Sequence, residues 1–240
     1  MPTAPEGPAE PAAKPRKARR ILGLDAGERR AERRRLLLDA GLELFGTRGY
    51  SGTSIEQICQ TAGVGTYSFY EVFSSKEDVI VALYERIFRG IEQDLVAAFE
   101  KTVEEPDQIS ILLGLFVHGI VDDPLVARVA FIEVGGISAR MEEHRWQNRN
   151  RLAEFIRTVA RSTAPRYLPA GKAPKKPAFR DREPNVRRNN LAIAGAIVEL
   201  IRDWLLDPDP GSVDDLVFDI VDFCERSLRA ALAEHPDLMI

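Results

Sequence analysis

Residues 61–79, TAGVGTYSFYEVFSSKEDV, place hydroxyl-bearing side chains beside an apolar helical face. Phe69, Val72 and Phe73 recur at the spacing of one helix face, so we expect them to be buried. The positions left outward are Gly65, Thr66, Tyr67, Ser68, Tyr70 and Glu71. Hydroxyl groups can donate to or accept from base edges, while tyrosines and helix N-terminal amides can hold phosphates. The chemistry indicated is hydrogen bonding to a nucleic acid.

Two short helices around a glycine turn are expected to position these side chains. The run TSIE at 53–56 reads as a capping box, in which Thr53 caps the first short helix and Glu56 takes its third position. Gly63 fits the position just beyond the end of that helix. The second short helix is expected over residues 65–73. This arrangement is typical of a helix-turn-helix, whose second helix lies in the DNA major groove.

Basic charge gathers at the start of the chain, before and within a long helix predicted over Glu28–Gly46. Residues 14–35 contain ten lysines or arginines against three acidic residues, a net charge of +7, and residues 161–188 also carry +7. Since the whole chain carries −4, the rest of it is strongly acidic. Residues 1–27 are expected to form a disordered basic extension. A polyanionic partner is one interpretation of this extension, and a solvated tail is the other. The arginines placed to meet the DNA backbone are Arg29, Arg30, Arg33 and Arg34.

The segment Leu36–Ile80, LLLDAGLELFGTRGYSGTSIEQICQTAGVGTYSFYEVFSSKEDVI, resembles the DNA-binding region of the TetR family of bacterial transcriptional repressors. The resemblance is ungapped and covers about a fifth of the chain. It implies an all-α protein with a helix-turn-helix DNA-binding domain over 28–74 and an effector-binding and dimerisation domain over 75–240. It also implies a double-stranded DNA operator as partner. The contact positions that it implies are Thr53, Thr66, Tyr67, Ser68, Tyr70 and Lys76, beside Gly65.

The recognition helix departs from the family pattern at several positions. Gly65 stands where a serine is usual, Thr66 where a basic residue is frequent, and Tyr67 where a glycine is usual. Glu71 and Val72 replace a frequent pair of histidines. Glu71 can accept from a cytosine amino group, or it can simply stay away from phosphates. The operator sequence is therefore not transferable from the family.

The remainder of the chain is expected to be helical, because it contains no alternating strand pattern. A long helix over 75–102 carries an apolar stripe from Val79 to Ala98. The other helices are expected to begin at Pro106 and at Pro124, with an interruption at Gly135-Gly136, and to cover 138–161, 190–206 and 212–233. Residues 164–184 contain five prolines and are expected to form an exposed loop. A role for this loop at a pocket mouth or on DNA stays open.

The family resemblance implies a small-molecule effector inside the C-terminal domain. The candidate ligand-binding residues are Phe116, His118, Phe131, Glu133, Trp146 and Asn150, which are polar or aromatic residues on otherwise apolar helices. Ordinary core packing is the alternative for the aromatic residues. Glu133 would need a partner if buried, and an exposed or salt-bridged Glu133 is the alternative. The three histidines lack metal-ligand spacing, so we expect no metal and no cofactor.

The last two predicted helices are too apolar for each to have a solvated face. The resemblance implies that they form a four-helix interface with a second copy of the chain, and a wholly intramolecular core is the alternative. A two-fold dimer would place two recognition helices at groove-matched spacing on a near-palindrome.

The combined features favour a homodimeric, ligand-responsive repressor that a small molecule releases from a palindromic operator. A small-molecule-binding helical protein with weak or non-specific DNA binding is the alternative, and an activator or nucleoid-type binder is a third possibility. An enzyme is disfavoured, because GVGT at 63–66 follows a helix and not a strand and therefore fails the dinucleotide fingerprint. The uncharged run Gln108–Val121 has 14 residues, too few to span a bilayer as a helix. With two cysteines outside any CxxC pattern and no signal-like N-terminus, we expect a cytoplasmic protein.

Overall fold

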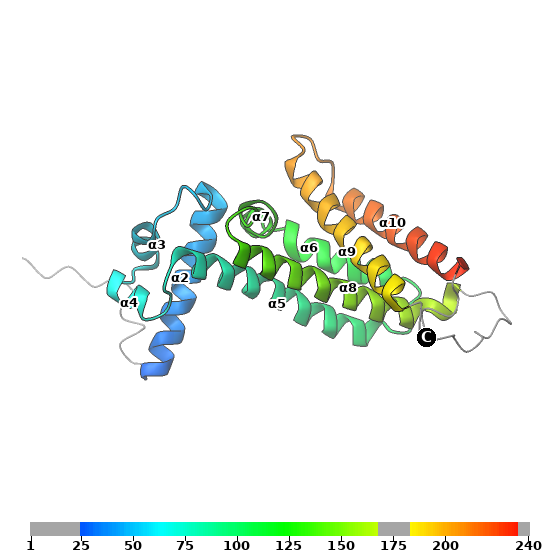
Figure 1. Ribbon diagram of the computed structural model, residues 1–240, viewed down its shortest axis with the longest axis horizontal. Helices are drawn as coiled ribbons and strands as arrows, with labels where there is room; N and C mark the ends of the chain where they lie inside the picture. Colours follow the sequence, from blue (N-terminus) through cyan, green and yellow to red (C-terminus); the bar gives the residue numbers. More distant parts are fainter. Residues whose placement is uncertain (1–24, 168–182, 235–240) are drawn as a thin grey trace, which may run out of the picture.

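The computed structural model describes residues 25–167 and 183–234. Every regular element in these two stretches is a helix, which confirms the expected all-α fold. The elements are α2 (Ala26–Arg48), α3 (Ile55–Ala62), α4 (Thr66–Tyr70), α5 (Lys76–Thr102), α6 (Gln108–Val121), α7 (Pro124–Arg128), the π-helix η1 (Val129–Glu133), α8 (Ala139–Tyr167), α9 (Glu183–Leu206) and α10 (Val213–Glu234). Figure 1 shows α2, α3 and α4 at one end of an elongated molecule, with α5 running from that end into a bundle with α6 and α8 to α10.

Two hydrophobic clusters divide the interior, and both include residues of α5. The first joins the buried faces of α2, α3 and α4 to residues Val79–Tyr84 at the start of α5. The second lies among α6, α8, α9 and α10 and takes Ile91 and Leu95 from farther along α5. Ile87 and Phe88 pack against both clusters. The core around the helix-turn-helix therefore continues into α5, beyond the end of the predicted DNA-binding domain.

Short-range capping explains where the first helices begin and end. The side chain of Ser54 accepts from the backbone N–H of Gln57, whose side chain accepts from the backbone N–H of Ser54. The capping box was therefore predicted one residue too early, with Thr53 as the cap. Gly63 has φ 67° and ends α3 in the left-handed conformation, as predicted. Ser75 caps α5 by accepting from the backbone N–H of Asp78.

The middle of the chain contains an irregularity that the sequence did not indicate. The helix that begins at Pro124 changes at Val129 into the π-helix η1, which lasts to Glu133. A turn through Gly135 and Gly136 then separates it from α8, as expected from the glycine pair. Isolated π-helical turns often occur at functional sites. η1 places Val129 in the first hydrophobic cluster and Phe131 in the second, so it joins the two.

Several predicted boundaries need correction. α6 begins at Gln108 and not at Pro106. The predicted loop over 164–184 is wrong at both ends, because α8 continues to Tyr167 and α9 begins at Glu183. Residues 168–182 of that loop, and residues 1–24 of the predicted disordered extension, lie outside the described residues. The extension was predicted too long, because Asp25 caps α2 and residues 26–27 belong to that helix.

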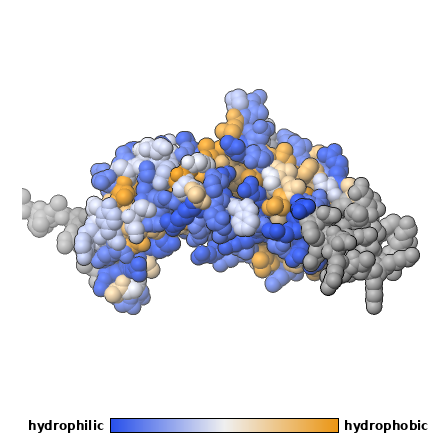
Figure 2. All heavy atoms as spheres, viewed as in Figure 1, coloured by the Kyte–Doolittle hydropathy of each residue, from blue (hydrophilic) through white to orange (hydrophobic). Residues whose placement is uncertain are grey.

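Within the described ranges no single helix has the length and apolarity to cross a membrane, although α6 together with Pro124–Glu133 passes on composition despite a 91° bend. The face shown in Figure 2 is mainly hydrophilic, with apolar residues interspersed among polar ones.

Candidate DNA-contacting surface and effector cavity

The predicted burial holds for Phe69 and Phe73, but Val72 is only half-buried, and α4 ends at Tyr70 and not at Phe73. Phe69 is fully buried, and its ring lies 6.0 Å from that of Phe73. Tyr67 is 81% exposed and Tyr70 is 57% exposed, which leaves both hydroxyls in solvent. The other outward positions are Gly65, Thr66 and Glu71, all exposed, and Ser68, which is half-buried. Burial of Phe69 therefore fixes which hydroxyls face outward.

Lys76 has a structural role that the sequence did not indicate. Its ammonium group donates to the backbone carbonyls of Tyr50 and Thr53 at 2.8 Å each, and lies 4.2 Å from the centre of the Tyr50 ring. Burial lowers the pKa of the Lys76 ammonium. Two of its three N–H donors are therefore used to hold the turn before α3 against the start of α5, and one remains for a phosphate.

Thr53 does not present its hydroxyl as expected. The residue is 3% exposed, and its hydroxyl donates to the backbone carbonyl of Gly49 at 2.8 Å and of Leu44 at 3.3 Å. A buried hydroxyl that is already hydrogen-bonded cannot reach a nucleic acid without disrupting the fold. The structure thus contradicts the prediction of a DNA contact by this side chain. Thr53 instead closes the end of α2 onto the turn that follows it.

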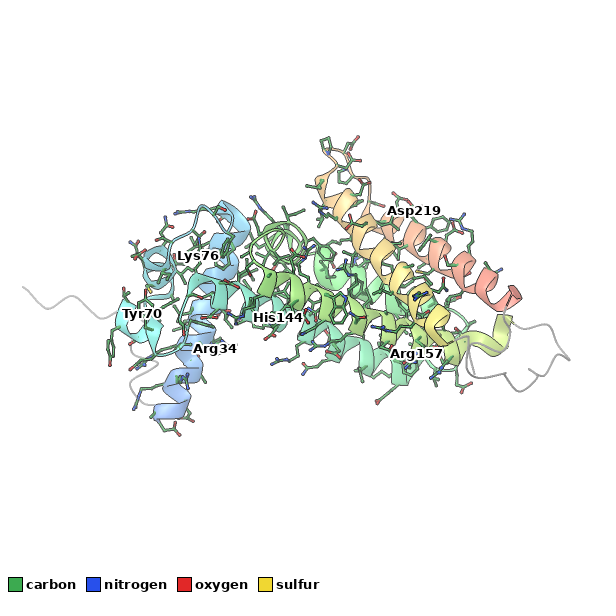
Figure 3. All side chains as sticks on the ribbon, in the orientation of Figure 1. Arg34, Tyr70, Lys76, His144, Arg157 and Asp219 are labelled. Atoms are coloured by element: carbon green, nitrogen blue, oxygen red, sulfur yellow. The ribbon has the colours of Figure 1, made fainter. Side chains whose placement is uncertain are left out.

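The basic residues of α2 differ in their surroundings. Arg33 forms an ion pair with Glu71, which links α2 to the residue following α4. Arg34 lies over the ring of Phe73, with its guanidinium carbon 4.9 Å from the ring centre. Arg30 is exposed on the first turns of α2, and Arg29 beside it is half-buried. Figure 3 shows Arg34 and Tyr70 at the same end of the molecule. This end therefore combines arginines of α2 with hydroxyls of α4.

Three adjoining cavities lie inside the second cluster, and Phe116 and Leu152 line all three. We call the first the arginine cavity. It encloses about 540 Å³, including the space at its open mouth, and lies among α5, α6, η1, α8 and α9. Its lining residues are Tyr84, Phe88, Phe116, Ala130, Phe131, Arg145, Asn148, Arg149, Leu152, Val198 and Arg202. Of the six predicted ligand-binding residues, the structure brings Phe116 and Phe131 together here.

Two predicted ligand-binding residues are held in polar contacts with other side chains and line none of the three cavities. His118 Nδ1 lies 3.0 Å from an Asp122 carboxylate oxygen, and its Nε2 lies 3.7 Å from Asp214. Glu133 accepts from the backbone N–H of Tyr50 at 2.8 Å and from Arg128 Nε at 2.9 Å. These contacts correct the expectation that either side chain lines a pocket. Glu133 is therefore salt-bridged to Arg128, which was the alternative prediction for this residue.

The other two candidates, Trp146 and Asn150, lie on α8 but line none of the three cavities. Trp146 is 46% exposed. Asn150 donates to the carbonyl of Trp146 at 2.7 Å, four residues earlier in the same helix, and accepts from Arg187 at 3.4 Å. The residues of α8 that line the arginine cavity are instead Arg145, Asn148, Arg149 and Leu152. A type-based choice of residues could not settle which face of α8 turns inward.

Sequence reasoning missed the polar lining of the arginine cavity. Arg145, Arg149 and Leu152 recur at i, i+4 and i+7 on α8, so the spacing itself was the signal for a shared face. Charged residues also occur at the other positions of this part of α8, so the shared face did not stand out in the sequence. Tyr84 on α5 is 5% exposed, and burial raises the pKa of its hydroxyl, an effect that Asn148 and the arginines partly oppose. Tyr84 therefore stays protonated and can act as a hydrogen-bond donor.

No group of three histidine, cysteine, aspartate or glutamate side chains suited to a metal ion occurs among the residues that the structure describes.

Comparison with known protein sequences gives matches over about a third of the chain or less. Residues 37–83 match the family model described as "Bacterial regulatory proteins, tetR family". The HTH-type transcriptional regulator BetI of Brucella anthropi is 31% identical over 83 residues, which cover 35% of this chain and 43% of that protein. The match thus spans less than half of the curated relative.

Solved structures extend the likeness of fold to most of the chain. A TetR-family regulator from Syntrophomonas wolfei superimposes with a TM-score of 0.62 at 21% identity, covering 82% of this chain and 95% of that one. FadR from Bacillus subtilis, solved in complex with stearoyl-CoA, superimposes with a TM-score of 0.61 at 16% identity, covering 79% and 96%. At these identities the likeness is one of fold.

Proposed function

We propose, from the premise that this chain belongs to the TetR family of bacterial regulatory proteins through its residues 37–83, that it is a ligand-responsive, sequence-specific transcriptional regulator and most simply a repressor. The observation that carries the proposal is the outward face of α4. There Tyr67 and Tyr70 extend into solvent from a helix whose other face is anchored by buried Phe69. A recognition helix needs this combination, since the buried face fixes the orientation of the side chains that read DNA.

The proposed regulator acts as a homodimer through α9 and α10. Ile197, Ile201 and Ile220 are fully buried, which fixes these helices on their own bundle. Leu206 is nevertheless 58% exposed and Phe218 is 70% exposed. A second copy that covers this surface would remove both from water and set two recognition helices at a fixed spacing.

The shared helix α5 supports a mechanism for release from DNA. Its first turns belong to the core of the helix-turn-helix, whereas Tyr84 and Phe88 line the arginine cavity. An effector that occupies the cavity would shift α5 and alter the spacing of the two recognition helices. It can do so only if it binds more tightly to the form that does not fit the operator.

The effector proposed for this site is a small molecule held between the helices of the bundle, and we propose neither catalysis nor a cofactor. FadR of Bacillus subtilis, which shares the fold, holds stearoyl-CoA, and this supports the capacity of such a bundle to take a ligand. We further propose a cytoplasmic location, where operator DNA is accessible.

A second candidate function is a ligand-binding helical protein with weak or non-specific affinity for DNA. The Arg33–Glu71 ion pair favours it, because it neutralises an arginine beside the recognition helix. Phosphate contacts supply most of the non-specific affinity for DNA, so each neutralised arginine weakens it.

The test is selection of random duplex DNA by the purified full chain, followed by sequencing. We expect enrichment of a two-fold symmetric site. Salt-sensitive binding without an enriched site would instead favour the second candidate. On an enriched site, Tyr67→Phe should weaken binding about 3- to 10-fold, because it removes one hydrogen-bonding hydroxyl. Trp146→Phe is the matched control, since Trp146 is an exposed aromatic residue on α8.

A further inference from the structure

The arginine cavity contains one arginine, Arg149, that no carboxylate contacts directly, although Glu142, which holds Arg145, lies near enough for Arg149 to help lower its pKa. Arg145 is held by Glu142, with contacts of 2.7 Å and 2.9 Å, and Arg202 lies 3.6 Å from Glu199. Arg149 lines the same cavity and is half-buried. It has no hydrogen-bond or ion-pair partner among residues 25–167 and 183–234. A half-buried guanidinium without a carboxylate or carbonyl partner is suited to bind an anion.

Neutral polar groups line the same cavity as this guanidinium. Tyr84 of α5 is buried, and burial raises the pKa of its hydroxyl, which therefore stays protonated. Asn148, next to Arg149, accepts from Arg151 at 3.2 Å and forms a hydrogen bond with the Tyr84 hydroxyl that lowers the pKa of that hydroxyl. The polar part of the arginine cavity therefore consists of donors, which complements an acceptor-rich anionic group.

Beyond this polar region the space extends toward α10, where its lining is apolar. The second and third cavities continue from Phe116 and Leu152, and the lining of the one that reaches α10 includes Leu112, Cys224 and Leu228. None of the residues lining that α10 cavity is charged. Along α8 the lining passes from Arg149 to Val159, a rise of about 15 Å at the usual 1.5 Å per residue. The apolar body therefore runs from the arginine cavity into the α10 cavity, whereas Glu92, Asn148 and Arg151 add polar groups to the third cavity.

We propose that the effector is a single-chain amphiphile with an anionic head, in which the head binds Arg149 and the hydrocarbon tail extends along α8 toward Cys224. This inference rests on the proposed function only in calling the ligand an effector. A compact polar ligand would leave the apolar space unfilled, and a cationic head would meet Arg149 with like charge. Glu92 is the only acidic residue that lines the three cavities, and it lines the third and not the arginine cavity.

The chemistry of the head group is shared by free fatty acids and by acyl thioesters of phosphorylated carriers. The experiment is calorimetric titration of the full chain with laurate, lauroyl-coenzyme A, dodecanol and dodecyltrimethylammonium. We expect the two anionic probes to bind more tightly than the alcohol, and the cation to bind most weakly. Tighter binding of laurate would identify a carboxylate head, and tighter binding of lauroyl-coenzyme A a phosphate-bearing one. Equal binding of anionic and cationic probes, or no binding of either anionic probe, would overturn the proposal.

Variants localise the head and the tail. Arg149→Gln should weaken binding of the anionic probes about 10- to 100-fold, as expected for a lost charge-assisted hydrogen bond, and leave dodecanol binding unchanged. Arg157→Gln is the matched control, because Arg157 lies farther along α8, pairs with Glu154 and lines none of the cavities (Figure 3). Leu152→Phe should weaken all probes with a tail, because it fills space common to the three cavities. An unchanged affinity of Arg149→Gln for laurate and lauroyl-coenzyme A would overturn the assignment of the head.

Adding the DNA assay separates this proposal from the proposed function. Anionic probes that bind and release a selected operator would support both. A chain that binds the anionic probes but selects no DNA site would leave the amphiphile site standing and remove the regulator. Selection of a symmetric DNA site without binding of the anionic probes would remove the amphiphile site and leave the regulator standing.

Discussion

Glu133 accepts a hydrogen bond from the backbone N–H of Tyr50 at 2.8 Å, across 83 positions of sequence. It joins the end of η1 to the turn between α2 and α3, and Arg128 supports the same carboxylate at 2.9 Å. Phe131 of η1 lines the arginine cavity. The backbone carbonyl of Tyr50 accepts a hydrogen bond from the ammonium group of Lys76 at the start of α5. A second physical connection between cavity and helix-turn-helix therefore exists beside α5.

Removal of this connection should destabilise the protein. In Glu133→Ala the half-buried Tyr50 N–H loses its acceptor, so the free energy of unfolding should fall by about 1–3 kcal/mol. Glu133→Gln keeps an oxygen acceptor for Tyr50 and loses only the charge next to Arg128, so its loss should be smaller. Urea unfolding of both variants measures the difference. Equal stability of the wild type and Glu133→Ala would show that the contact contributes nothing.

Gly49 should tolerate no side chain, in contrast to Gly63. Gly49 has φ 80° and ψ 163°, a region that is essentially limited to glycine, and an added Cβ would lie 2.9 Å from Glu133 Oε2. Gly63 has φ 67°, but an added Cβ there meets nothing within 4 Å. We expect Gly63→Ala to cost about 1–2 kcal/mol of unfolding free energy and Gly49→Ala clearly more. Thermal and urea denaturation of the pair test this order, and a larger loss in Gly63→Ala would contradict it.

The buried thiol of Cys224 should make the protein sensitive to alkaline pH. Burial raises the pKa of this thiol from 9.0 to about 12. The folded chain therefore keeps a proton that the unfolded chain loses. The stabilisation is fully present below pH 9 and is lost as pH rises toward 12, by about 1.4 kcal/mol per pH unit.

Cys224→Ala isolates this contribution. Its cavity lowers the unfolding free energy at every pH, but its stability should decline less than that of the wild type between pH 8 and pH 10, by about 1 kcal/mol. Urea titrations across this range measure both curves. Parallel curves would show that the thiol does not titrate differently in the two states.

Neutralising Glu71 should strengthen binding to DNA. Glu71→Gln would free Arg33 from its ion pair and so add one cation beside α4. The slope of log K against log salt concentration should steepen by about one, with tighter binding at low salt. Glu154→Gln serves as control, because it releases Arg157 far along α8. An unchanged slope in Glu71→Gln would mean that Arg33 does not reach a phosphate.

The exposed aromatic residue of α10 tests the proposed dimer. Phe218 is 70% exposed, so Phe218→Glu should leave the fold intact and convert a dimer to a monomer in analytical ultracentrifugation. Ile111→Glu, at a 42% exposed position of α6, is the control and should not change the sedimenting mass. A chain that remains dimeric with Glu at 218 would place the interface elsewhere.

Local pattern was enough to predict the helix-turn-helix. The periodicity of apolar residues predicted burial of Phe69 and Phe73, and the turn chemistry predicted the left-handed Gly63. Ser75 was among the predicted caps of α5. Such signals act between residues a few positions apart, so they need no knowledge of the rest of the chain.

Contacts between distant segments decided what the sequence alone could not. Residue type suggested Glu133 and Trp146 as ligand-binding residues, and the family resemblance suggested Thr53 as a DNA contact. In the structure Glu133 joins η1 to Tyr50, Trp146 is exposed, and Thr53 is buried with its hydroxyl hydrogen-bonded to the backbone. The lining of the arginine cavity comes from five elements that only packing brings together. Periodicity indicates that a helix has a buried face. The tertiary arrangement of all the helices decides which helix that face packs against and where a cavity remains between them.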